Sequence, residues 1–544
     1  MPASRENRSG SANDGYSSWI GLVFLFNLIV GTGALTLPSA FAKTGWLLGL
    51  VLITILAFIS YMTVTFVIET MACANAIYYW GRLEQLKRER EREGYNAQDA
   101  DSTTEEDNDS AIVNDFEPNR LIQNDSVNHT IEHMPLFSQR TRYYEIETKI
   151  ELVDMARIFF NDTGRVLFFL CFAIYLYGDL SIYAAAVAKT LRDVICTRIS
   201  VNATDDELDA KPCWTNIEAG QWSTFTRLDC YRLSLIGFIV LLGPFTFFNV
   251  QKTKYIQMCT ILLRWMAFSI MISIAVRRLM VYGQQAYPPM ANPYGIPSLF
   301  GTCVYSFMCH HSLPSLVAPI RDKSGLHKML SADYMLIAGF YLFLALTGSF
   351  AFAVLEDLYT LNFIPTQKQS NIFLVVIEYF LALFPVFTLS TSFPIIAITL
   401  RNNLEALFMG STSTQTNATN VDSAYSSFCQ FLLRRCTFPL MAILPPIAVT
   451  YFTDSLASLV SFTGSYAGTG IQYIIPIALV WRARKTCRTI LGQGIVNDYS
   501  SPFQSVAWLI FVLVWSVTSV VFVTVNFLTN SLRQPNHLGI HFTH

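Results

Sequence analysis

Charged residues are scarce in this sequence. Asp, Glu, Lys and Arg make up 14% of its 544 residues, whereas soluble domains carry about a quarter. The hydrophobic share of 52% is close to that of soluble proteins, so the deficit of charge is the unusual feature. The formal net charge of -2 excludes the strongly basic surface on which nucleic-acid binding depends.

Signatures of common enzyme chemistry are also missing. The sequence has no glycine-rich loop ending in Gly-Lys that would cradle phosphate, and no cysteine pairs at the spacing of a zinc site. Gly464, Gly468 and Gly470 have the spacing of helix packing rather than of nucleotide binding. We therefore expect no enzyme activity, no cofactor and no metal centre.

A cleavable signal peptide is not expected. Residues 1–16 are polar, and the apolar run that follows has no small-residue cleavage site. We interpret this run as an uncleaved first membrane helix behind a cytoplasmic tail.

What the sequence has instead is a series of apolar runs long enough to cross a bilayer, which takes roughly 20 residues each. About eleven such runs are present by that criterion, and they predict an all-α, multi-pass membrane protein. The expected spans are Ser17–Leu37, Trp46–Ala72, Arg165–Thr190, Tyr231–Asn249, Ile256–Met280, Ser298–Ile320, Ala332–Val354, Ile372–Leu400, Thr437–Phe452, Leu456–Trp481 and Ser505–Phe527.

Basic residues in short loops indicate the orientation, because cytoplasmic loops are enriched in Lys and Arg. The loops after the fourth, sixth, eighth and tenth spans are basic, and all four are cytoplasmic if the N-terminus is cytoplasmic. Arg277 and Arg278, at the opposite end of the fifth span, are a mild exception. The plasma membrane and endolysosomal membranes are both compatible with this topology.

The expected organisation has five parts. A cytoplasmic tail (1–16) precedes the first two spans (17–80). Spans three to ten occupy 150–481, and the eleventh span with a C-terminal tail occupies 482–544. The acidic segment 81–149 has too few apolar residues to bury a core, so we expect a disordered cytoplasmic linker whose first part extends the second helix. A regulatory docking segment is the alternative.

The loop 191–228 is expected on the non-cytoplasmic side. Its sequon places a glycosylation site at Asn202. Three cysteines flank the loop, and an oxidising compartment would allow a disulfide among them. Three pairings are possible; we expect Cys196 with Cys213, which leaves Cys230 at the start of the fourth span.

Two spans are expected to be interrupted. Residues 27–39 (NLIVGTGALTLPS) and 306–315 (SFMCHHSLPS) carry small or polar residues in mid-membrane, and both end in Leu-Pro-Ser. Gly31 and Gly33 weaken the first helix. Five spans separate the starts of the two segments, so they cross in opposite directions, as in an inverted five-plus-five repeat.

An interrupted span needs a reason, because each unpaired backbone group in hydrocarbon costs several kcal/mol. Such a break persists where it lines a cavity or binds a ligand. Its positive half-helix ends suit a carboxylate, and its free carbonyls suit a cation. Close packing of helices through small residues is the alternative interpretation.

These segments resemble the amino acid/auxin permease family, particularly its sodium-coupled neutral amino acid transporter branch. Residues 27–33 are similar to the family's Asn-x-Ile-x-Gly-Ser-Gly, and residues 307–314 to its Phe-x-Cys-His…Leu-Pro. Residues 392–401 and 464–476 resemble its patterns in helices eight and ten. Outside the acidic loop, nearly the whole chain also resembles a divergent animal group of that family.

The resemblance implies a bundle of the bacterial leucine-transporter type that works as a secondary transporter. Helices one and six would form the substrate site, and helices one and eight the cation site. Thr32 stands where the family usually has Ser, and His311 where it often has Pro, which leaves the substrate open. The implied substrate residues are Gly31, Thr32, Gly33, Ser306, Phe307 and His310, and the implied cation residues are Asn27 and Ser392.

Other polar residues fall within the spans. Asp179 is a candidate proton carrier, because an intramembrane carboxylate is costly and usually functional. The alternative is a carboxylate near the outer end that is hydrated or hydrogen-bonded to Tyr. His310 and His311 could respond to pH, but adjacent side chains diverge around a helix, so no shared metal is expected. Glu69 and Arg264, toward the cytoplasmic ends of their spans, are expected to snorkel or to form a structural pair rather than to act in transport.

Together these features predict an alternating-access transporter of amino acids or similar small zwitterions, embedded in the lipid bilayer and driven by Na⁺ or H⁺ as the coupling ion. The alternative is a non-transporting membrane amino-acid sensor or scaffold that signals to a cytoplasmic regulatory partner through residues 81–149.

Overall fold

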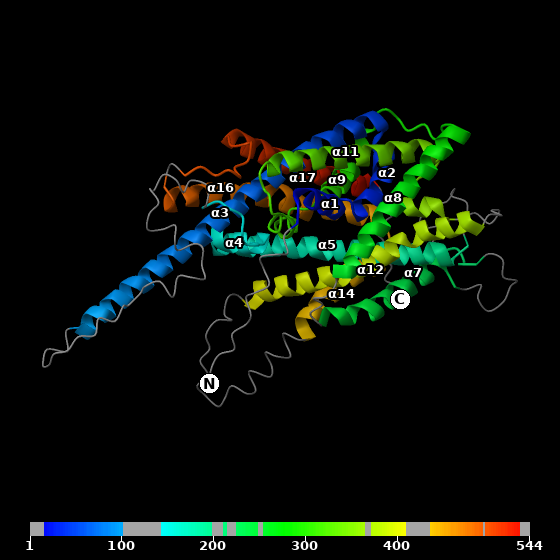
Figure 1. Ribbon diagram of the computed structural model, residues 1–544. Coiled ribbons are helices and arrows are strands. Elements are labelled where there is room, and N and C mark those ends of the chain that lie inside the picture. Colours follow the sequence, from blue (N-terminus) through cyan, green and yellow to red (C-terminus); the bar gives the residue numbers. More distant parts are fainter. Residues whose placement is uncertain are drawn as a thin grey trace.

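The structure, a computed structural model, describes residues 16–101, 143–197, 210–214, 225–247, 254–364, 372–409, 436–492 and 495–533. These residues form a bundle of helices that lie side by side, and the described ranges contain two isolated β-bridges but no β-strand (Figure 1). The all-helical architecture expected from the sequence is confirmed.

Helices occupy every apolar run that the sequence predicts as a span. Eight runs form one main helix each: α3 (Trp46–Asp101), α5 (Asp162–Ile195), α7 (Arg227–Leu242), α8 (Lys254–Tyr282), α11 (Leu326–Ala351), α12 (Ile372–Met409), α14 (Phe438–Phe452) and α17 (Val506–Arg533). Three runs are divided: α1 (Ser18–Ile29) from α2 (Thr32–Thr44), α9 (Ile296–Ser306) from α10 (Leu313–Val317), and α15 (Leu456–Thr463) from α16 (Ile475–Ile490). The short helix α4 (Leu152–Phe159) was not expected.

Length and hydropathy support membrane insertion. Within the described residues, seven helices are long and apolar enough to cross a bilayer, or eight when the bent pair α1–α2 counts as one span. The three further expected spans coincide with shorter pieces, namely α9–α10, α14 and α15–α16.

Large apolar side chains cover the outside of the bundle. Leu167, Val240, Leu262 and Met335, from four different helices, are each more than 60% exposed. Soluble monomers rarely expose so much contiguous apolar surface. A lipid bilayer is the solvent that this surface fits, so the protein is an integral, multi-pass membrane protein.

Helix α3 is much longer than a span. It continues to Asp101 and projects beyond the bundle (Figure 1), so the predicted helical extension is present and the linker starts later than residue 81. The alternating charges support this, with Glu84 and Arg88 paired one turn apart. Residues 102–142 lie outside the described residues.

The end of the expected linker is ordered. Asn75 of α3 accepts hydrogen bonds from the backbone N–H (3.0 Å) and the hydroxyl (2.6 Å) of Thr148. Residues 143–149, expected to be disordered, therefore pack back on the bundle, because a buried amide on α3 captures their backbone.

Glycines set the closest helix approaches in the core. Residues Gly464–Gly468 and Gly470–Ile474 form π-helical turns between α15 and α16, a geometry frequent at functional sites. A Cβ atom at Gly464 would overlap the carbonyl group of Gly301 on α9. The packing role expected for Gly464 is confirmed.

Candidate functional site

The first interruption lies between α1 and α2. Helix α1 ends at Ile29, α2 begins at Thr32, and the two axes differ by 56°. Gly31 adopts φ −122° and ψ −141°, outside the helical region. The break predicted from Gly31 and Gly33 is therefore present.

The second interruption lies between α9 and α10. Helix α9 ends at Ser306, and the chain is non-helical until Leu313. Phe307 and His310 in this stretch are fully buried. The predicted break in the sixth span is also present, and its backbone lies in the core rather than at the surface.

The two interruptions meet. Helix α2 packs along α9, and α1 packs against α10. A Cβ atom at Gly33 would lie 2.6 Å from the Cα atom of Ser306, far inside contact distance. The chain therefore brings Gly33 and Ser306, two of the expected substrate residues, into direct contact.

Tyr341 of α11 joins the two broken ends. Its hydroxyl lies 3.0 Å from the carbonyl oxygen of Ile29 and 2.9 Å from that of Ser306, and it shares its proton between them. These are the last residues of α1 and α9, whose terminal carbonyls lack helical partners. The ring of Tyr341 also contacts Phe307, with centroids 5.1 Å apart. No motif in the sequence around Tyr341 pointed to this role.

Arg264 of α8 occupies the C-terminal end of α1. Its guanidinium Nη1 donates a hydrogen bond to the carbonyl oxygen of Asn27. The side-chain amide of Asn27 is buried, and neither its nitrogen nor its oxygen has a hydrogen-bond partner. Arg264 is thus a positive charge at the break, and its partner is a backbone carbonyl instead of water or the carboxylate of Glu69.

Ser392, the other expected cation residue, lies on α12. Its hydroxyl donates back to the carbonyl oxygen of Thr388 in the same helix at 3.3 Å. This back-bonding is the usual state of Ser within helices. The assignment of Asn27 and Ser392 to a cation site stays a prediction.

Asp179 lies beside the second break. It is buried on α5, and its Oδ1 accepts a 2.5 Å hydrogen bond from the hydroxyl of Tyr305, the residue before Ser306. The Tyr-bonded state considered for this carboxylate is present. Its position is the core and not the hydrated end of the helix.

The adjacent histidines diverge, as expected. His310 Nε2 lies 2.9 Å from the hydroxyl oxygen of Thr63 on α3. The ring of His311 instead faces α5, with its centroid 5.6 Å from that of Tyr175. The two imidazoles therefore belong to different helix contacts.

One further buried carboxylate was missed. Asp333 of α11 is fully buried, and neither carboxylate oxygen has a hydrogen-bond partner. It lies near the start of the helix, where the sequence shows a single acidic residue just before an apolar run. Because burying a charge in a membrane span is costly, this position alone would have made Asp333 a candidate functional residue.

An ion-pair network closes one end of the bundle, which we call the charged end. Asp357, in the loop after α11, lies 3.4 Å from Nζ of Lys43 on α2 and 3.8 Å from Nζ of Lys189 on α5. Arg192, one turn after Lys189, pairs with Asp454 in the loop before α15 at 3.3 Å. The network thus connects α2 and α5 to the loop after α11 and to the loop before α15.

The opposite end is held by a different pair. Arg484 of α16 donates two hydrogen bonds to the carboxylate of Glu69 on α3, at 2.7 and 2.8 Å, and the backbone N–H of Ser501 donates a third at 2.9 Å. The structural role expected for Glu69 is present, with Arg484 rather than Arg264 as its partner.

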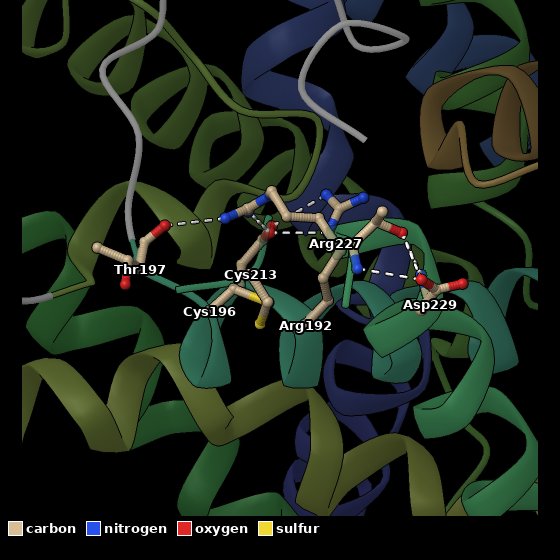
Figure 2. The surroundings of a disulfide bond; sticks show 8 residues. Arg192, Cys196, Thr197, Cys213, Arg227 and Asp229 are labelled. Atoms are coloured by element: carbon tan, nitrogen blue, oxygen red, sulfur yellow. Dashed lines mark hydrogen bonds and ion pairs between the residues drawn. A yellow bond between two sulfur atoms is a disulfide. The ribbon is translucent and has the colours of Figure 1, made fainter. Parts of the chain in front are cut away.

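A disulfide joins Cys196 and Cys213 at the charged end, the pairing expected from the sequence (Figure 2). Cys230 is free and buried. Asn202, the expected glycosylation site, lies outside the described residues.

Comparison with known proteins gives one family and a set of relatives. The family described as "Transmembrane amino acid transporter protein" matches residues 14–78 and 137–525, which include both interruptions. The chain is 50% identical over 527 residues to "Transmembrane protein 104 homolog" of Drosophila melanogaster, covering 94% of this chain and 97% of the relative. It is 43% identical over 525 residues to human "Transmembrane protein 104", covering 95% and 98%. The "Transmembrane protein 104 homolog" of Dictyostelium discoideum is 32% identical over 539 residues, covering 95% and 98%.

Proposed function

Because the chain belongs to the transmembrane amino acid transporter family, we propose that it carries amino acids or similar small zwitterions across a membrane by alternating access. The observation that carries the proposal is the meeting of two interrupted helices, at Gly31–Gly33 and Ser306–Phe307, in the core. Eleven spans in an inverted five-plus-five repeat are part of the same proposal.

The substrate's charged groups would bind at the broken helix ends. The first N–H groups of α2, at Thr32 and Gly33, have no partners one turn earlier in a helix, and they carry the positive end of the helix dipole. They suit the carboxylate of a zwitterion. In the present conformation Gly33 is closed against Ser306, so substrate entry requires α2 and α9 to separate.

Proton coupling is favoured over sodium coupling by two residues at the breaks. Arg264 donates to the carbonyl oxygen of Asn27, where a sodium ion at the end of α1 would have to bind, and a fixed guanidinium opposes a second cation there. Asp179 supplies a carboxylate that can take up a proton next to Ser306. We therefore propose H⁺ as the coupling ion, with Asp179 as its acceptor.

The two ends of the bundle would act as alternating closures. With the N-terminus cytoplasmic, the charged end around Asp357 faces the non-cytoplasmic side, and the Glu69–Arg484 pair faces the cytoplasm.

Glycosylation at Asn202 belongs to this orientation. An Asn202→Gln variant that removes a glycosidase-sensitive mass shift would support the orientation, and an unchanged mass would contradict the assignment of Asn202.

The test is uptake by proteoliposomes that contain the purified full-length chain. A panel of radiolabelled amino acids is offered under an inward proton gradient and, separately, an inward sodium gradient. We expect concentrative uptake that depends on the proton gradient. Facilitated equilibration without concentration, or uptake that requires sodium alone, would contradict proton coupling; no flux for any amino acid would contradict transport.

A sensor remains the second candidate, and α3 is the observation that favours it. The helix continues from the bundle to Asp101, so a change in the core has a rigid path out of the membrane. A substrate that raises the thermal unfolding temperature without any flux would support the sensor, whereas flux that survives removal of residues 102–142 would favour transport.

A further inference from the structure

Three cysteine sulfurs meet at the charged end. The Sγ atoms of Cys196, Cys213 and Cys230 all lie within 4.8 Å of one another, and all three residues are buried. Only two of them can form a disulfide at one time, and the structure pairs Cys196 with Cys213. A free thiol therefore lies next to a disulfide, which is the arrangement required for thiol–disulfide exchange.

Hydrogen bonds hold the backbones of these cysteines independently of the disulfide. The N–H of Cys213 donates to the carbonyl oxygen of Phe225 at 2.9 Å, and the N–H of Thr197 donates to the carbonyl oxygen of Cys213 at 2.8 Å. Cys230 lies in the first turns of α7, where its N–H donates to the carbonyl oxygen of Thr226. An exchange of sulfur partners would leave these backbone hydrogen bonds in place.

Charges of both signs lie beside the cluster. Arg227 extends over the disulfide to the carbonyl oxygen of Thr197, 3.0 Å from its Nη1 (Figure 2). Asp193 of α5 pairs with both neighbouring arginines, because its Oδ1 lies 2.9 Å from Nε of Arg192 and 2.5 Å from Nη2 of Arg227. The thiolate is the species that attacks a disulfide, so the exchange should be faster at alkaline pH.

We propose that Cys230 is the exchanging thiol of a three-cysteine redox site at the charged end. Its thiolate attacks Sγ of Cys213, the Cys213–Cys230 bond forms, and the Cys196–Cys213 bond breaks. Cys196 leaves as a thiolate and takes up the proton that Cys230 released. The numbers of thiols and disulfides are unchanged, so the step requires no oxidant or reductant.

The exchange changes the helix to which Cys213 is covalently bound. In one covalent form Cys213 is bound to the end of α5, and in the other it is bound to the first turns of α7. Trp214 stacks on Phe225 with ring centroids 5.7 Å apart, and both pack on the cluster. This cover limits attack by external thiols and favours exchange within the cluster. The site does not depend on whether the protein transports.

The test is peptide mapping of disulfides in the full-length protein without reduction. The protein is incubated at pH 8.5 in detergent, quenched with acid, alkylated and digested. We expect a peptide linked through Cys213 and Cys230 beside the one linked through Cys196 and Cys213, and the Cys230→Ala variant should give only the latter. If the wild type gives only the Cys196–Cys213 peptide after hours of incubation, the proposal fails.

A second variant tests the geometry separately. Cys196→Ala leaves Cys213 and Cys230, and hydrogen peroxide, which is small enough to reach covered thiols, should oxidise them to a disulfide while it is reduced to water. Recovery of both as alkylated thiols, in protein whose thermal unfolding matches the wild type, would also overturn the proposal. Cys259, which is exposed, serves as the internal control in the samples without an added oxidant, because it should remain an alkylated thiol there.

Discussion

Gly33 lies against Ser306 so closely that a methyl group in place of its hydrogen would come within 2.6 Å of the Ser306 Cα atom. The contact joins the start of α2 to the end of α9, so the two broken helices share one van der Waals surface. A side chain at residue 33 would hold them apart.

Gly33→Ala is therefore expected to cut transport at least tenfold and to destabilise the fold by about 1–3 kcal/mol, the usual cost of overpacking. Uptake and thermal unfolding of the same preparation measure the two effects. Gly339→Ala on α11 is the matched control, because nothing lies within 4 Å of its added Cβ. Equal uptake by Gly33→Ala and Gly339→Ala would contradict the assignment of the site.

Tyr341→Phe should separate the two broken ends without changing the volume of the core. It leaves the carbonyl oxygens of Ile29 and Ser306 without their shared donor, at an expected cost of about 1–3 kcal/mol. Tyr359→Phe is the control, because the buried Tyr359 hydroxyl has no hydrogen-bond partner. Chemical denaturation should give Tyr341→Phe a clearly lower free energy of unfolding than Tyr359→Phe. The reverse order would refute the bridging role of the Tyr341 hydroxyl.

Asp179→Asn should uncouple proton movement from substrate movement, because an amide cannot take up the proton. We expect exchange of substrate across the liposome membrane to persist, while concentrative uptake and acidification of the lumen, read with a pH-sensitive dye, disappear. Tyr305→Phe removes only the hydrogen bond to Asp179 and should shift the pH dependence of uptake without abolishing it. Normal acidification by Asp179→Asn would exclude it as the proton acceptor.

The ion pairs of Asp357 at the charged end predict that the stability of the fold depends on pH. Burial alone would raise the pKa of its carboxyl, but Lys189 and Lys43 hold that pKa below its ordinary value. Ionised Asp357 thus stabilises the fold above the unfolded pKa of about 3.9, and the stabilisation is lost as pH falls through the lower folded pKa. Asp357→Asn should cost about 3 kcal/mol at pH 7, and the difference from wild type should shrink below about pH 4.

The control for this prediction is Glu151→Gln. Glu151 and Lys149 form an ion pair in which both side chains are about half exposed, so its loss should cost at most about 1 kcal/mol. Thermal unfolding of the three proteins from pH 7 to pH 3 makes the comparison. A constant difference between wild type and Asp357→Asn over that range would contradict the network.

Glu69 and Arg484 should show strong coupling in a double-mutant cycle. Removing either partner leaves the other charge buried, which costs about 3–5 kcal/mol. The double variant Glu69→Gln with Arg484→Met should be less destabilised than the sum of the single variants by at least about 1 kcal/mol. Additive effects on the unfolding free energy would show that the two hydrogen bonds at 2.7 and 2.8 Å contribute nothing.

Hydropathy and backbone chemistry were sufficient to predict the helices of the eleven apolar runs and the interruptions of the first and sixth runs, but not the short helix α4 or the π-helical turns between α15 and α16. The eleven apolar runs all became helical, since unpaired backbone in lipid leaves few alternatives. Gly31 marked the first break and the polar stretch after Ser306 marked the second. These features are local, so they can be read from neighbouring residues in the sequence.

The contacts between the breaks could not be predicted, because they depend on how distant helices rotate against each other. Tyr341 was one tyrosine among 25, and only the fold shows that its hydroxyl reaches two helix ends. Arg264 was expected to snorkel or to pair with Glu69, since an arginine near a helix end usually reaches water or an acidic partner. Its partner is instead the carbonyl of Asn27, 237 residues away in sequence, which no pattern in either segment reveals.

The length of α3 has a mechanical consequence. At 1.5 Å per residue its 56 residues span roughly 80 Å, about twice the full thickness of a bilayer. Because the helix packs against α11 and α16 within the bundle, it acts as a lever whose short arm lies among the moving parts. A tilt of α3 by about 10° would move its free end by roughly 7 Å. A spectroscopic label on that end, outside the membrane, could therefore detect a helix movement too small to measure at the interruptions themselves.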